Sequence, residues 1–125
     1  MARAPKRLMQ ADESGALLRE EIALYLARHG TADICKILEF ALQELETAQR
    51  HFELGHFVQL RMEARALGRR MGRMGLSRPE AVATALAEVA GERRIVEAAA
   101  LLERLGRILR FASRTAALME PPAYL

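Results

Sequence analysis

The sequence predicts an all-α protein, an up-down antiparallel four-helix bundle with an additional N-terminal helix. Of the 125 residues, 51% are hydrophobic but only 5% are aromatic, and Ala, Leu, Arg and Glu dominate, which favours helices over sheets. Apolar residues recur at steps of three and four along several stretches, and glycines separate these stretches. Short loops between long amphipathic helices imply antiparallel neighbours.

The first two helices are predicted from their caps and their apolar stripes. Ser14 is the expected N-cap of a helix that runs to about His29, and Gly30 ends it. Its stripe consists of Leu18, Ile22, Tyr25 and Leu26. Thr31 is the expected cap of a second helix that ends at Gly55. The stripe of this second helix consists of Ile34, Ile37, Leu38, Ala41, Leu45, Ala48 and Phe52.

A third helix is predicted to end at Gly75, and a fourth to begin directly after it. The apolar stripe of the third helix consists of Phe57, Leu60, Ala64, Leu67, Met71 and Met74. In "SRPE", Ser77 is the expected N-cap of the fourth helix, Pro79 occupies the first turn and Glu80 the capping-box position. Gly91 ends this helix, whose inward residues are Val82, Leu86 and Val89.

A long fifth helix is predicted from about Arg93 to Leu118, because Pro121 and Pro122 cannot continue it. Its expected inward residues are Ile95, Ala99, Leu102, Leu105, Leu109 and Ala112. The helices form a single domain over residues 14–118. We expect a disordered basic tail at residues 1–13 and a proline-containing tail at residues 119–125.

The composition disfavours export, a membrane span and catalysis. No apolar run approaches the roughly 20 residues of a membrane span, and "MARAPKR" is followed by polar residues rather than by a signal core. We therefore expect a cytoplasmic protein without membrane contact. Cys35 is the single cysteine, the three histidines lack metal-ligand spacing, and no nucleophilic triad or phosphate-binding loop is evident. We expect no catalytic residue, no metal, no cofactor and no enzymatic activity.

The stretch "RMEARALGRRMGRMGLSR", residues 61–78, is costly for a helix. Like charges four residues apart repel by about 0.2–0.5 kcal/mol per pair, and each interior glycine costs roughly 1 kcal/mol. Four arginines at every fourth position form a row that faces away from the predicted core, together with exposed apolar residues: Arg61, Arg65, Arg69 and Arg73 with Val58 and Met62. Gly68 and Gly72 lie at the margin of that face, where the absence of side chains would let another surface approach the backbone. We interpret this face as a docking surface for an acidic partner, and a merely solvated face is the alternative. The predicted partner-binding residues are Val58, Arg61, Met62, Arg65, Gly68, Arg69, Gly72 and Arg73.

The same helix resembles the signature helix of the histidine phosphotransfer (HPt) family, which reads approximately A-H-x-L-K-G and later L-G. The matching run is Ala64-Arg65-Ala66-Leu67-Gly68-Arg69, continuing to Met74-Gly75-Leu76. The flanking stretches "ILEFALQELETAQRHFELGHFVQLRMEA", "SRPEAVATALAEVAG" and "AAALLERLGRIL" resemble the neighbouring helices of the family. The likeness covers about residues 31–115. It implies a helical bundle that works with receiver domains in two-component signalling.

The resemblance lacks the residue that carries the family's chemistry. Arg65 stands where the family has its phosphoryl-accepting histidine, and Gly68-Arg69 replaces the Lys-Gly pair. A guanidinium group stays protonated at neutral pH and cannot act as a nucleophile. The resemblance therefore implies a degenerate module that binds the receiver domain of a response regulator, or a sensor histidine kinase, without phosphoryl transfer. In that family the receiver's phosphorylation site is a pocket of carboxylates, with which Arg65 could form a bidentate pair.

Three alternatives remain open. The chain could be an active phosphotransfer protein that uses a displaced histidine, His56. It could be a basic helical nucleic-acid-binding protein, although arginines also occur on other segments and no recognition motif is visible. Val58 and Met62 could equally form a patch for self-association.

Overall fold

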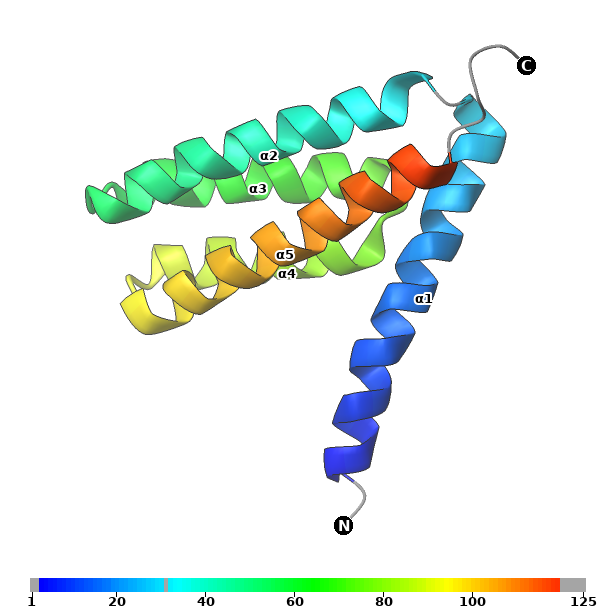
Figure 1. Ribbon diagram of the computed structural model, residues 1–125. Helices are drawn as coiled ribbons and strands as arrows, with labels where there is room; N and C mark the ends of the chain where they lie inside the picture. The colour runs from blue at the N-terminus through cyan, green and yellow to red at the C-terminus, as the bar shows by residue number, and fades with distance from the viewer. Residues whose placement is uncertain (1–2, 31, 120–125) are drawn as a thin grey trace.

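The computed structural model describes residues 3–30 and 32–119, and all regular structure in this part of the chain is helical. The helices are α1 (Arg3–His29), α2 (Ala32–Glu53), α3 (Phe57–Arg73), α4 (Ser77–Gly91) and α5 (Ile95–Met119). Helices α2 to α5 lie alongside one another, and the chain reverses its direction at each turn between them, while the N-terminal part of α1 projects away (Figure 1). None of the described helices combines the length and the apolarity needed to cross a membrane.

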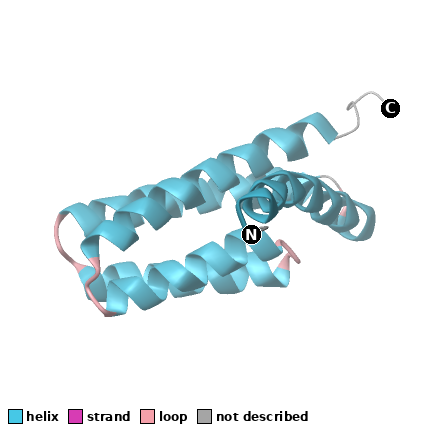
Figure 2. Cartoon of the chain, turned by 90° about the horizontal axis from the view of Figure 1, so that it is seen from below, coloured by secondary structure: helices cyan, strands magenta, loops and turns pink. Residues whose placement is uncertain are grey.

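The turns follow the predicted glycines. The glycines that end α1, α2 and α3 have left-handed backbones, with φ of 80° at Gly30, 75° at Gly55 and 77° at Gly75, a region that favours glycine. The turn after α4 differs, because Gly91 is still helical and Arg93 takes the left-handed conformation, with φ of 56°. The α2–α3 and α4–α5 loops lie at the same end of the molecule (Figure 2).

The core lies between the helices and includes residues from all five. The predicted stripe of α3 is confirmed, because Leu60, Ala64, Leu67, Met71 and Met74 are buried and Phe57 is partly buried. Helix α3 packs most extensively against α4, and α5 contacts both α4 and α2. Helix α1 makes smaller contacts with α2, α4 and α5. The α3 surface that faces away from this core is therefore fixed by the packing of α3 against α2 and α4.

The first helix begins earlier than predicted. It starts at Arg3 rather than after Ser14, which lies inside the helix and cannot be its N-cap. Pro5 does not prevent this start, because it lies in the first turn, where backbone N–H groups have no helical partner. The expected tail of residues 1–13 is thus helical from Arg3 onward. Thr31, the expected cap of α2, and residues 120–125 lie outside the described residues.

The start of α4 also differs from the prediction. Its N-cap is Leu76, which makes no side-chain cap hydrogen bond, and Ser77 is the first helical residue. The backbone N–H and the hydroxyl of Ser77 instead donate to the carboxylate of Glu21 on α1. The capping function therefore comes from another helix, and no capping box with Glu80 forms.

The beginning of α5 is rotated relative to the prediction. Ile95 is 58% exposed and Ala99 is exposed, whereas Ala98 is buried. The first turn of α5 directly follows the α4–α5 loop, at the same end of the molecule as the α2–α3 loop (Figure 2). The rest of the predicted stripe is confirmed, since Leu102, Leu105, Leu109 and Ala112 are buried.

Candidate functional site

The candidate docking face lies on the outer side of α3. Because its apolar stripe is buried against the core, α3 presents the other side of the helix to solvent. Val58 and Met62 are each 63% exposed there. The four arginines of the row are exposed as well, at Arg61, Arg65, Arg69 and Arg73. The structure thus brings six of the eight predicted site residues together on one accessible surface.

The other two predicted site residues, Gly68 and Gly72, face α4 of the same chain. Gly68 is buried, and a Cβ atom at this position would lie 3.4 Å from Thr84 Oγ1 and 3.5 Å from Ala83 Cβ. A Cβ atom at Gly72 would lie 2.6 Å from Oε2 of Glu80. The surface that these glycines admit is therefore α4 and not an outside partner, which corrects the sequence-based interpretation of Gly68 and Gly72.

A groove of about 680 Å³ separates the exposed parts of α3 and α4. Its α3 wall carries Arg61, Arg65 and Arg69. Its opposite wall carries three acids, Glu80 and Glu88 within α4 and Glu92 directly after the last residue of α4. None of the four arginines of the row has an ion pair within 4.0 Å among the described residues, so opposite charges face each other across the groove without direct contact. Their attraction offsets part of the repulsion within the arginine row.

Arg61 has a further contact that explains its place in the row. Its side chain lies over Gly91, where a Cβ atom would be 3.3 Å from Cδ and 3.4 Å from Nε of Arg61. Gly91 is the last residue of α4, and the last turn of α4 contains no basic residue. A cation at this position interacts favourably with the negative C-terminal end of the helix. Arg61 thus serves α4 as well as the outer face.

The turn between α2 and α3 gathers two histidines and a glutamate. Nδ1 of His51 lies 2.9 Å from Oε1 of Glu63, and the rings of His51 and His56 are 5.7 Å apart between centroids. The carboxylate of Glu63 can only accept, so Nδ1 of His51 donates this hydrogen bond, and in the neutral imidazole the lone pair lies at Nε2. His56 is exposed and makes no side-chain cap hydrogen bond to α3. No group of three metal-ligating side chains is found in the described part of the chain.

Sequence reasoning missed the acidic wall of the groove and the partner of His51. Glu80, Glu88 and Glu92 recur at steps of eight and four, which are multiples of the arginine step on α3, and this pattern was a usable signal once α3 and α4 were taken as neighbours. Glu63 gave no such signal, because its contact with His51 depends on the geometry of the turn between α2 and α3.

The exposed α3 face offers guanidinium groups beside a valine and a methionine. The guanidinium groups can bind carboxylates or phosphates, and the valine and methionine can cover apolar surface of a partner. A guanidinium group does not act as a nucleophile. A scan of protein-family models found no match to the chain, and searches of curated proteins and of solved structures found none either.

Proposed function

We propose that this chain is an interaction module of two-component signalling, a pseudo-HPt protein that binds a receiver domain or a sensor histidine kinase without phosphoryl transfer. In this proposal α2 to α5 form an antiparallel four-helix bundle of the HPt type, and α3 carries the docking face. The proposal is supported by the sequence resemblance of residues 31–115 and by the exposure of the α3 surface that corresponds to the family's signature helix.

The observation that carries the proposal is the position of Arg65. It is exposed in the middle of the arginine row, one helical turn from Arg61 and from Arg69. It has no ion-pair partner within 4.0 Å among the described residues, so its guanidinium is available to a partner. An arginine at the family's histidine position can pair bidentately with the carboxylates of a receiver pocket.

The acidic wall of the groove restricts how a partner approaches. Glu88 and Glu92 repel an acidic surface that comes from the side of α4. Val58 and Met62 are exposed on the same face but do not line the groove. Because interface centres favour arginine and methionine, we place the centre of the docking face between Met62 and Arg65.

The test is isothermal titration calorimetry, in which the purified receiver domains and sensor histidine kinases of the same organism are each titrated with the chain. Charge reversal in Arg65→Glu should weaken association with the receiver that binds by at least tenfold, about 1.4 kcal/mol. The matched control is Arg114→Glu, the same charge change at an exposed position of α5. Equal losses in both variants, or no binding to any receiver or kinase, would remove the docking model. Binding of the chain to nucleic acid, with an affinity that falls steeply as the salt concentration rises, would instead favour the nucleic-acid alternative.

A second candidate function is phosphoryl transfer at a displaced histidine, and one observation favours His51 over His56 for it. Glu63 orients the His51 ring and leaves Nε2 as the nucleophile. In that reaction the P–O bond of a receiver's aspartyl phosphate breaks, a P–N bond forms at Nε2, and the aspartate carboxylate leaves. Acid-labile phosphate on the wild-type chain that His51→Ala abolishes and His56→Ala retains would establish this function. Absence of label supports the pseudo-HPt proposal.

A further inference from the structure

A second pocket, of about 370 Å³, lies where α1 meets α5 and the N-terminal end of α4. Its floor is apolar and consists of Leu18 from α1 with Ile108 and Phe111 from α5. Its rim carries three arginines, Arg78 from α4 and Arg104 and Arg107 from α5. It shares no lining residue with the arginine-lined groove between α3 and α4.

The charge at this rim is of one sign. No carboxylate lines the pocket. Of the nearby acids, Glu103 pairs with Arg107 at 3.4 Å, with both side chains largely exposed, and Glu21 is held by Ser77. Burial lowers the pKa of Arg78, and the positive charge of Arg104 lowers it further. The guanidinium groups of Arg78 and Arg104 therefore lie close enough for their charges to repel, and an anion between them would relieve this repulsion.

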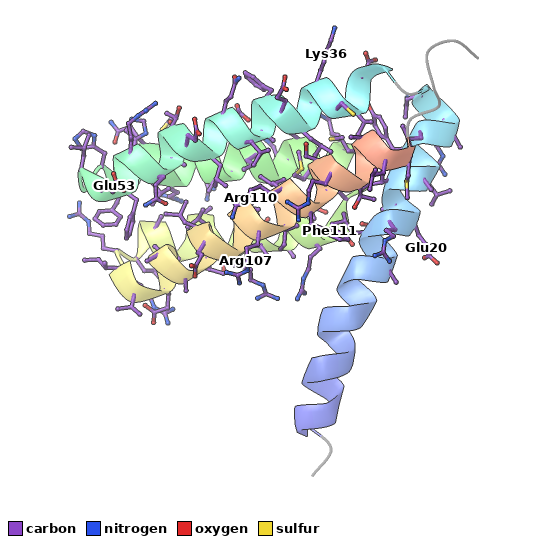
Figure 3. The ribbon with its side chains drawn as sticks, viewed as in Figure 1. Glu20, Lys36, Glu53, Arg107, Arg110 and Phe111 are labelled. Carbon is purple, nitrogen blue, oxygen red and sulfur yellow. The ribbon has the colours of Figure 1, made fainter. Side chains whose placement is uncertain are left out.

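The floor is preformed by contacts outside the pocket. Leu18 is 3% exposed. The guanidinium of Arg19 lies 5.6 Å from the ring centroid of Phe111, a cation–π contact that holds the ring between α1 and α5. Figure 3 shows Phe111 on α5 near its crossing with α1, with Arg107 about one turn earlier on α5. An apolar group can thus enter between the helices while the rim faces solvent.

We propose that this pocket binds a small amphiphilic anion, a phosphate monoester or carboxylate that carries an aromatic or short aliphatic group. The arginines hold the anion, because planar guanidinium groups match carboxylate and phosphate oxygens. The apolar group covers Phe111 and Ile108. The cavity volume falls in the lower part of the range of about 300–1,000 Å³ that small-molecule sites occupy. This inference does not depend on the function proposed for α3.

The test compares three probes by titration calorimetry: 1-naphthyl phosphate, inorganic phosphate and 1-naphthol. We expect 1-naphthyl phosphate to bind at least tenfold more tightly than either of the other two. Arg78→Gln and Arg104→Gln should each weaken its binding by at least fivefold. Arg114→Gln is the matched control on α5, because Arg114 is exposed and lines neither this pocket nor the groove between α3 and α4. This variant should bind 1-naphthyl phosphate as tightly as the wild type does.

Four outcomes would overturn the proposal: no binding of 1-naphthyl phosphate, equally tight binding of inorganic phosphate, equally tight binding of 1-naphthol, or an equal loss in Arg114→Gln. Should the arginine variants unfold, the wild-type chain still decides the matter by amide NMR. The shifts caused by 1-naphthyl phosphate must then cluster at residues 15–18, 77–78 and 104–111, and shifts elsewhere contradict the site. Sedimentation with phosphatidic acid vesicles that Arg78→Gln abolishes would reassign the pocket to a lipid headgroup.

Discussion

Ser77 and Glu21 join the beginning of α4 to the middle of α1. The backbone N–H of Ser77 lies 3.0 Å from Oε1 of Glu21, and its hydroxyl lies 2.6 Å from Oε2. The carboxylate thus satisfies a backbone donor that the helix itself leaves unpaired, and it places a negative charge at the positive end of α4.

Glu21→Ala should lower the free energy of unfolding by about 0.5–2 kcal/mol, the usual cost of a lost helix cap, as measured by urea denaturation. Because the two residues act as one unit, adding Ser77→Ala to this variant should cost little more. Glu20→Ala is the control, since Glu20 is exposed. An equal loss in the control would show that Glu21 stabilises the fold through charge alone.

A glycine within α3 and the glycine in the turn after α3 should respond to alanine with opposite changes in the free energy of unfolding. Gly68→Ala should raise the free energy of unfolding by up to about 1 kcal/mol, because alanine favours the helix and its Cβ meets Thr84 Oγ1 at an ordinary 3.4 Å. Gly75→Ala should lower it by about 1–2 kcal/mol, because a left-handed φ of 77° disfavours a side chain. Thermal unfolding of both variants decides this, and a loss in Gly68→Ala would mean that α4 packs closer than described.

Leu67 and Arg65 test the orientation of α3. Leu67 is 3% exposed in the core, so Leu67→Ala should cost roughly 2–5 kcal/mol. Arg65 is exposed, and Arg65→Ala should change stability by less than about 0.5 kcal/mol. Denaturant titration measures both, and a reversed order would exclude the docking face.

Adjacent alanines test the corrected orientation of α5. Ala98 is 0% exposed, so Ala98→Gln would crowd the core and bury an amide, and we expect a loss of more than about 2 kcal/mol. Ala99→Gln lies at an exposed position and should stay within about 0.5 kcal/mol of the wild type. The midpoints of chemical denaturation distinguish the two, and similar midpoints would contradict the orientation of α5 described above.

The helices from α2 onward could be predicted from the sequence because local rules define them. Gly55 and Gly75 each adopt the backbone that ends a helix, and the α3 stripe faces a continuous core. The start of α4 could not be predicted in this way, because the carboxylate that binds Ser77, its first residue, belongs to Glu21 of α1, 56 positions earlier in the sequence.

The candidate site could be predicted only in part. The exposure of Arg65 follows from helical periodicity alone. The role of Gly68 does not, because it depends on which helix lies against α3, and Thr84 and Ala83 of α4 fill that space. The acidic wall of the groove escaped prediction for the same reason, since charges on different helices meet only after the helices are paired.

The distant contact of Ser77 with Glu21 has a consequence for how the chain opens. Each of α3, α4 and α5 packs against the helix directly before it across a short turn, so forming these sequential pairs restricts few residues. Helix α1 is much farther from α4 and α5 along the sequence, and it contacts them over smaller surfaces. Its docking therefore orders more of the chain for fewer contacts. We therefore expect amide protons of α1 to exchange with solvent before those of α3 and α4, through a local unfolding step that leaves the other helices folded.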